Sequence, residues 1–203
     1  MKYDFRFDNG NNLWFTSDIH FSHGNIIKYC SRPYSDVEEM NEKLIENWNN
    51  LVKKDDIVFI LGDMGFGSTT KITELIERLN GHKYLTPGNH DREHLTNSNF
   101  MCCFECVKDI IYIKVGKYPI YLSHFPFLCF DGAYKGMDAT WQLYGHCHSK
   151  VGSMGMDAQR LIHCFPSQYD VGVDNNDYKP VSFKQVEQII TDQELSLNLI
   201  RKC

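Results

Sequence analysis

Five short apolar segments of the 203-residue chain each end in a polar cluster, and this pattern constrains the fold more than any other feature. Helix-like stretches separate the first three segments, which predicts alternating strands and helices and hence a largely parallel sheet. Ligands of such sheets gather outside the carboxyl ends of the strands, so distant parts of the chain can converge there. The clusters contain the following residues: Asp18 and His20; Asp63; Asn89 and His90; His124; His146 and His148.

Periodicity and capping predict the elements between these clusters. The continuous apolar run at residues 57–61 is typical of a strand that is covered on both faces. Apolar residues at helical spacing predict a helix on each side of this run, and the first begins at a capping box of Ser35 and Glu38. A second capping box, of Ser182 and Gln185, predicts a closing helix. The other predicted strands, of which the third and fourth form a hairpin, are 13–16, 83–86, 110–115, 118–122, 140–144 and 169–173.

The composition excludes several classes of protein. Hydrophobic residues make up 42% and charged residues 23%, which is typical of globular chains and opposes disorder. No apolar run approaches the roughly 18 residues that span a bilayer, and the first residues lack the apolar core of a secretion signal. The net charge of -5 disfavours non-specific binding of nucleic acid. We expect a single cytoplasmic domain over residues 1–203, with no membrane partner.

The eight cysteines do not form a recognisable framework. They are too few for a disulfide scaffold, and reduced thiols are expected. Cys103 and Cys106 make a lone CxxC motif, and a zinc site there would need distant partners such as Cys102 or Cys164. We interpret these as ordinary thiols and leave the role of the cluster open. Cys147 would point away from the flanking histidines in an extended segment, so we interpret it as structural.

The five polar clusters share one chemistry. Carboxylate, amide oxygen and imidazole ligands suit Mn, Zn and Fe ions, and a carboxylate can bridge two ions. Asp18 and His20 would lie on one side of the chain if the backbone is extended there, and the same holds for His146 and His148. Two ions held roughly 3.5–4 Å apart polarise a phosphoester and deprotonate a bridging water at neutral pH. Hydrolysis of a phosphoester is therefore the natural reaction.

The motifs and their order resemble those of the calcineurin-like metallophosphoesterase superfamily. The resemblance covers residues 13–148 and is carried by Asp18-x-His20, Gly62-Asp63, Gly88-Asn89-His90-Asp91, His124 and Gly145-His146-x-His148. It implies a four-layer α/β/β/α sandwich of mixed sheets, with a dimetal site at the strand carboxyl ends. It also implies a ligand set: Asp18, His20 and His148 for the first ion; Asn89, His124 and His146 for the second; Asp63 as the bridge.

The resemblance further implies a mechanism. A hydroxide that bridges the two ions would attack the phosphorus of a small phosphodiester or phosphomonoester, such as a nucleotide. His90 would not be a ligand but would face the phosphate, where an imidazolium stabilises negative charge and can protonate the leaving oxygen. The ions would be divalent or mixed-valence; Mn is expected to serve in vitro, and Fe, Zn, Ni or Co also suit these ligands. The glycines before Asp63 and Asn89 would remove side chains where the backbone turns towards the ions.

The chain departs from several branches of the superfamily. Ser/Thr protein phosphatases carry GDxxDRG, whereas Met-Gly-Phe-Gly follows Asp63 here. Small phosphodiesterases carry DxHGN, but Phe21 and Ser22 separate His20 from His23 in this chain. The double-strand-break repair nuclease carries additional DNA-binding regions, which 203 residues with a net charge of -5 hardly accommodate. We expect a phosphoesterase outside these branches.

Two other functions stay open, a metal-stabilised binding scaffold without turnover and a nuclease acting on nucleic acid. A scaffold needs no residue that protonates a leaving group, so His90 argues against it. His23 could contact the phosphate, support a ligand or have no role, and Asp91 is expected to support its loop rather than bind metal. Aromatic residues near the motif loops could stack on a base or simply pack: Phe21, Phe66, Phe125, Phe127 and Tyr134. The physiological substrate, the native metal pair and the oligomeric state also stay open.

Overall fold

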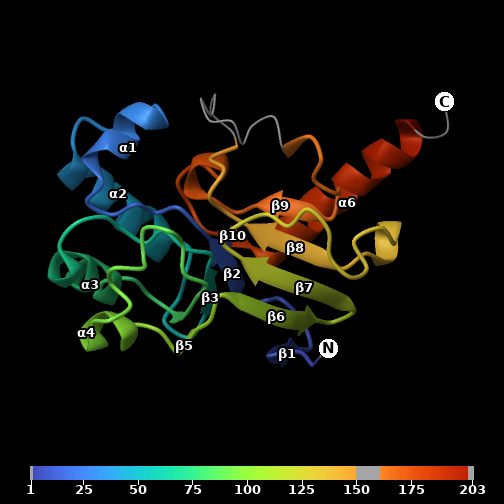
Figure 1. Ribbon diagram of the computed structural model, residues 1–203, viewed down its shortest axis with the longest axis horizontal. Helices are drawn as coiled ribbons and strands as arrows, with labels where there is room; N and C mark the ends of the chain where they lie inside the picture. The colour runs from blue at the N-terminus through green and yellow to red at the C-terminus, as the bar shows by residue number, and fades with distance from the viewer. Residues whose placement is uncertain (1, 150–160, 201–203) are drawn as a thin grey trace.

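The computed structural model describes residues 2–149 and 161–200, and its strands assemble into two five-stranded sheets (Figure 1). In spatial order the first sheet contains β10 (Val181–Ser182), β2 (Leu13–Thr16), β3 (Ile57–Ile60), β4 (His82–Leu85) and β5 (Cys106–Val107). The second contains β1 (Phe5–Phe7), β6 (Ile110–Val115), β7 (Tyr118–Ser123), β8 (Trp141–Tyr144) and β9 (Gln168–Asp170). The predicted hairpin at residues 110–122 is the antiparallel pair β6 and β7.

Both sheets are mixed. Strands β2 to β5 run parallel, and β10 pairs antiparallel with β2. In the second sheet β7, β8 and β9 run parallel, and β1 is parallel to β6. An isolated parallel bridge pairs Ser17 with Gly172, just beyond the ends of β2 and β9, and joins the two sheets there. This confirms the predicted α/β architecture of two mixed sheets with helices.

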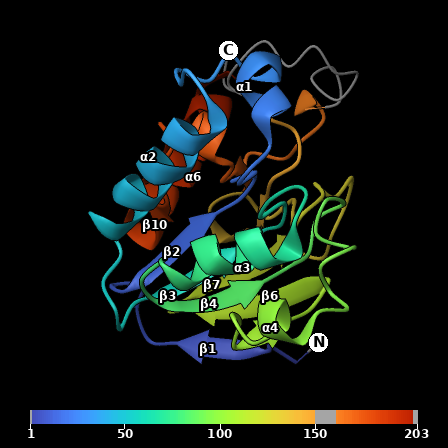
Figure 2. The same cartoon turned by 90° about the vertical axis from the view of Figure 1, so that its left-hand side faces the viewer.

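Helices lie on the side of the first sheet that faces away from the second sheet, as Figures 1 and 2 show. They are α1 (Gly24–Tyr29), α2 (Val37–Asn49), α3 (Thr69–Glu77) and α4 (Ser98–Met101). Met40 and Trp48 of α2 and Ile72 of α3 are buried in one core cluster with Val58 and Leu85 of the sheet. Complete burial of such side chains contributes roughly 1.5–3 kcal/mol each, and this fixes the helices on the sheet.

A second core cluster fills the space between the sheets. It contains Phe15 and Phe59 of the first sheet and Ile113 and Leu143 of the second, each of which is fully buried. The closing helix α6 (Phe183–Ile200) adds apolar side chains to this cluster and contacts β2, β9 and β10. The two cores on either side of β3 explain why residues 57–61 form a continuous apolar run.

Side-chain caps set the helix starts. Helix α6 begins at the predicted box, in which Ser182 N–H donates to Gln185 Oε1 (2.9 Å) and Gln185 N–H donates to the Ser182 hydroxyl (3.4 Å). Helix α2 differs from prediction, because its N-cap is Asp36, whose carboxylate accepts from the backbone N–H of Glu39 (2.8 Å). Ser35 instead donates to the side chain of Glu39. The box predicted at Ser35 was therefore one residue early, because the adjacent carboxylate caps in its place.

The cysteines within the described residues are present as thiols, and Cys203 lies outside those residues. Within the same ranges, no helix combines the length and apolar character that a membrane span requires.

Candidate metal centre

The predicted ligands converge at the carboxyl ends of β2, β3, β4, β7 and β8. Two groups of three have ligand atoms within 4.8 Å of one another: Asp18, His20 and His148; Asp63, His124 and His146. Asn89 joins the second group, because its Oδ1 lies 3.2 Å from Nε2 of His124. The structure therefore gathers all seven residues that the motifs singled out as ligands, although they come from five separate loops.

Asp63 lies between the two groups. Its Oδ2 is 3.7 Å from Nε2 of His20 and 3.5 Å from Nε2 of His124. One carboxylate thus faces an imidazole of each group, which is the position that a bridging ligand requires. Its other oxygen, Oδ1, accepts the backbone N–H of His90 at 2.9 Å and fixes the orientation of the carboxylate.

Five of the seven side chains extend from a left-handed backbone. The φ angle is 56° at Asp18, 55° at His20, 57° at Asp63, 70° at His146 and 46° at His148. Residues other than glycine rarely adopt this region, and such strain of about 1–3 kcal/mol per residue concentrates at functional sites. The condition of an extended backbone, on which the expected same-side placement within Asp18-x-His20 and His146-x-His148 depended, is therefore not met. The strands end before these residues, and tight turns bring the side chains together instead.

Two glycines make room for the ligands. A Cβ atom on Gly88 would lie 2.1 Å from Oδ1 of Asp63, and one on Gly62 would lie 2.5 Å from Nδ1 of His124. Gly62 also has a φ of 90°, which side-chain-bearing residues avoid. The steric role predicted for these glycines is confirmed.

His20 shows that the residues fit a metal ion. The residue is 2% exposed, and neither ring nitrogen has a hydrogen-bond partner in the described part of the chain. Burial, together with the charges of Arg32 and nearby histidines, holds the pKa of His20 well below its ordinary value, so the ring is neutral. A buried polar ring without partners is costly. A transition-metal ion would supply the missing partner of a ring nitrogen, because neutral imidazole is a common metal ligand.

Sequence reasoning missed a buried ion pair beneath this centre. The side chains of Arg32 and Asp174 are both fully buried, and two guanidinium nitrogens donate to the two carboxylate oxygens at 2.8 Å. The same guanidinium donates to the backbone oxygens of Asp18 (2.7 Å) and Ile19 (2.9 Å). The pair therefore holds the strained backbone of the first motif loop in place.

Asp174, in the short 3-10 helix η2 (Val173–Asn175), also orients His148. Its Oδ2 lies 2.6 Å from Nδ1 of His148, and Sγ of Cys30 lies 3.4 Å from the same nitrogen. The other nitrogen, Nε2, faces Asp18, whose Oδ1 is 3.9 Å away. Burial would lower the pKa of His148, but the contacts with Asp174 and Cys30 raise it to about 11. Carboxylates that bind a histidine in this way fix the ring orientation of metal ligands.

Asp91 ties two motif loops together. Its carboxylate accepts the backbone N–H groups of Asp63, Met64 and Gly88, each at 2.8 Å. Three such hydrogen bonds to one buried carboxylate hold the loops after β3 and β4 in register. The prediction that Asp91 supports its loop is confirmed.

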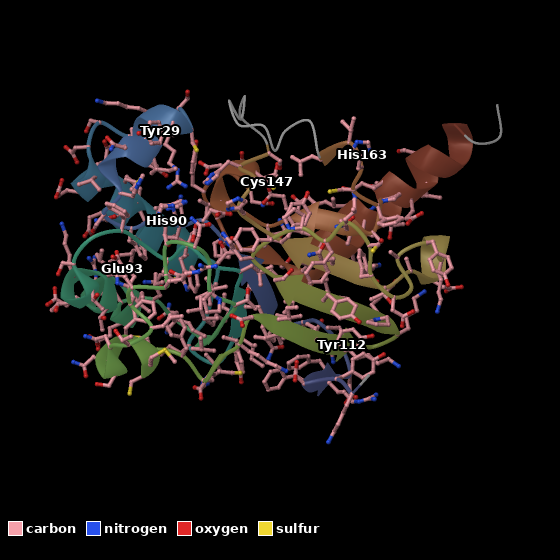
Figure 3. All side chains as sticks on the ribbon, viewed as in Figure 1. Tyr29, His90, Glu93, Tyr112, Cys147 and His163 are labelled. Carbon is pink, nitrogen blue, oxygen red and sulfur yellow. The ribbon has the colours of Figure 1, made fainter. Side chains whose placement is uncertain are left out.

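His90 and His23 border the centre. The ring of His90 lies 5.2 Å from that of His20 and 5.8 Å from that of His23, below α1 in Figure 3. A ring nitrogen of His90 is within 4.8 Å of ligand atoms of His20 and Asp63, so His90 also reaches the centre. His23 has a structural role, because its Nδ1 accepts the backbone N–H of Ile26 (3.0 Å) and caps α1.

Metal binding is expected to stabilise the protein more as the pH rises. Burial raises the pKa of Asp18 to about 6, and the pKa of His148 is raised to about 11. Raised folded-state values mean that the metal-free protein loses stability between the unfolded and folded pKa of each group as the pH rises. Metal binding requires both groups to release their protons, so the metal competes better at higher pH.

The test is the melting temperature with and without Mn²⁺ from about pH 6 to about pH 9, in which the shift should increase steadily. In Asp174→Asn the pKa of His148 should fall, so the shift should depend less on pH. A shift that is equal at every pH would contradict this account.

Comparison with known proteins agrees with the geometry. The calcineurin-like phosphoesterase family matches residues 12–168. The uncharacterized protein MJ1445 of Methanocaldococcus jannaschii is 36% identical over 180 residues, covering 88% of this chain and 90% of the relative. The gene 66 protein of Mycobacterium phage L5 is 32% identical over 188 residues, covering 80% and 86%.

Among solved structures, the protein of unknown function AQ665 from Aquifex aeolicus shares the fold, with a TM-score of 0.64 and 24% identity over 87% of this chain and 98% of the other. The matched range of the family contains every motif from Asp18 to His148. The chain therefore belongs to the calcineurin-like phosphoesterase family.

Proposed function

We propose that this protein hydrolyses a small phosphodiester or phosphomonoester with the help of two bound metal ions. The observation that carries the proposal is the position of Asp63, whose carboxylate faces one imidazole from each of two ligand groups. Membership of the family supports hydrolysis of phosphate esters in general. The bound ions would polarise the phosphoryl group and supply a nucleophile at neutral pH.

The proposed ligands divide as the contacts suggest: Asp18, His20 and His148 for one ion; Asn89, His124 and His146 for the other; Asp63 for both. The neutral ring of His20 presents a lone pair without reorganisation, and the ring of His148 is already oriented by Asp174 but must release a proton before it binds an ion. Oxygen and imidazole donors accept Mn, Fe, Zn, Ni or Co, and we propose Mn²⁺ for the first assays.

We propose that His90 stabilises the negative charge that develops on the phosphate and protonates the leaving oxygen. Its backbone N–H is held by Asp63, and its half-buried ring lies beside His20 at the rim of the centre. A substrate phosphate at the ions would therefore lie within reach of this imidazole. If His90 were instead a metal ligand, its replacement would change metal content as well as rate.

The test is hydrolysis of two phosphodiesters with Mn²⁺, one that releases 4-nitrophenolate and one that releases an alkoxide. We expect His90→Asn to lower kcat by about 10²-fold for the alkyl ester and less for the nitrophenyl ester, because a stable leaving group needs no proton. Metal content, measured by mass spectrometry, should stay unchanged. His82→Asn is the control, because that exposed histidine contacts Glu105 (3.0 Å) away from the centre.

Equal losses for both esters would contradict the acid role of His90, and loss of metal would make it a ligand. Wild-type protein that binds two ions but hydrolyses neither diesters nor monoesters would favour the scaffold over the enzyme.

A further inference from the structure

A cavity of about 440 Å³ adjoins the proposed metal centre. His146 belongs to both, and the remaining wall is largely apolar, with Phe125, Phe127, Leu128 and Leu161 among the lining residues. Figure 3 places Cys147 and His163, which also line it, above the strands of the second sheet. The volume lies within the roughly 300–1,000 Å³ of small-molecule sites. The metal centre and a space with the size and character of a binding pocket therefore share His146.

Buried amides hold the loop that forms one wall. Gln142 accepts the backbone N–H of Phe127 (2.9 Å) and donates to the backbone oxygen of Phe125 (3.0 Å). Gln168 donates to the backbone oxygen of Phe127 (3.0 Å), and both glutamines are almost completely buried. The backbone of the loop is therefore fixed, although Leu128 is 80% exposed. A rigid loop that presents apolar side chains to solvent is suited to binding rather than to core packing.

Phe125 connects this wall to the metal centre. Its ring lies 4.7 Å from those of both His124 and His146, and the residue is 42% exposed. Phe21, by contrast, is 1% exposed and belongs to the core. Of the aromatic residues near the motif loops, Phe125 and Phe127 are thus the ones that line the cavity, and Phe21 is a packing residue.

We propose that this cavity binds a planar aromatic group carried by the phosphoester substrate, either a simple aryl group or a nucleobase. The inference rests on the proposed function, because it places the ester phosphate at the metal centre. Two phenyl rings and the His163 imidazole line the cavity, and aromatic side chains bind planar rings by stacking. The net charge of -5 favours a small ester over a nucleic-acid polymer.

The test measures binding rather than turnover, by calorimetry on the Mn²⁺-loaded protein with phosphonates that cannot be hydrolysed. Phenylphosphonate is compared with cyclohexylphosphonate, and the 5′-phosphonate analogue of adenosine monophosphate with that of ribose 5-phosphate. We expect the aromatic member of at least one pair to bind about tenfold more tightly. Tighter binding of the aromatic member in the first pair would show that the cavity accepts a simple aryl group. Tighter binding of the aromatic member in the second pair would show that it accepts a nucleobase. Equal affinities within both pairs would refute the proposal.

Variants locate the preference in the cavity. Leu128→Asn and Phe127→Ala should each reduce it severalfold; the backbone bonds of Phe127 to Gln142 and Gln168 do not require its side chain. Ile162→Asn is the matched control, because Ile162 is 79% exposed but does not line the cavity. A preference that survives both cavity variants would overturn the assignment.

The two proposals can fail separately. If the protein prefers aromatic phosphonates but hydrolyses no ester, the proposed phosphoesterase activity is refuted and the proposed aromatic binding site stands. If it hydrolyses esters with metal but shows no aromatic preference, only the proposed binding site is refuted.

Discussion

Asp63→Asn is expected to lower metal-dependent phosphoesterase activity by about 10³-fold or more. Asp63 faces an imidazole of each ligand group, and an amide has neither the charge nor the second oxygen needed to hold two cations. Metal ions contribute several kcal/mol to transition-state stabilisation, and each 1.36 kcal/mol is about a tenfold change in rate. The measurement is kcat/KM for the Mn²⁺-loaded protein, with bound metal determined in parallel.

The variant should keep the fold, because the amide oxygen of the new side chain can still accept the backbone N–H of His90, and circular dichroism would check this. Asp55→Asn removes the same charge from an exposed position and should leave the rate unchanged. An Asp63→Asn protein that retains both ions and full activity would refute the dimetal proposal.

Arg32→Met is expected to lower the free energy of unfolding by about 3–5 kcal/mol, because the buried Asp174 carboxylate loses its guanidinium partner and keeps only His148. The backbone oxygens of Asp18 and Ile19 would also lose their donor. The strained first motif loop would then lose its support, so Mn²⁺ affinity should fall as well. Urea unfolding of the metal-free protein measures the first effect, and calorimetric titration of Mn²⁺ measures the second.

Arg78 provides a matched control. It forms a two-pronged contact of similar length with Glu42 (2.7 and 2.6 Å), but both side chains are about half exposed. Arg78→Met should therefore lower the free energy of unfolding far less than Arg32→Met does. An equal decrease in the free energy of unfolding in the two variants would show that the burial of Arg32 does not increase its contribution to stability. A destabilised Arg32→Met protein with unchanged Mn²⁺ affinity would contradict its role in holding the metal loop.

The strand ends and their polar residues could be predicted from the sequence because the signals are local. The run at residues 57–61 stops at a glycine, and Asp63 follows it directly. Each motif of this kind predicts where a strand ends and identifies the polar residue that follows the strand. The conformation of the motif loops could not be predicted, because the left-handed φ of Asp18 and His148 depends on contacts with distant segments.

The ion pair of Arg32 and Asp174 shows most clearly what could not be predicted from the sequence. They are 142 positions apart, and neither lies in a recognisable motif, so no spacing rule connects them. Only the three-dimensional fold brings η2 beneath the loop after β2. Short elements such as α1 and β10 escaped prediction for a different reason, because a few residues cannot display a period. Burial and hydrogen bonding with the rest of the molecule determine them.

The ligand loops belong to both sheets. Asp18 and Asp63 follow strands of the first sheet, whereas His124 and His146 follow strands of the second. Ions bound by these residues would crosslink the two sheets in the folded protein, and they would add stability because the complete site exists only in the folded state. Removal of the ions by a chelator would then weaken the contact between the two sheets. Backbone amide hydrogen exchange in β2 and β8 should become faster as a result. The availability of metal ions would then determine the conformational stability of the protein as well as its rate of phosphoester hydrolysis.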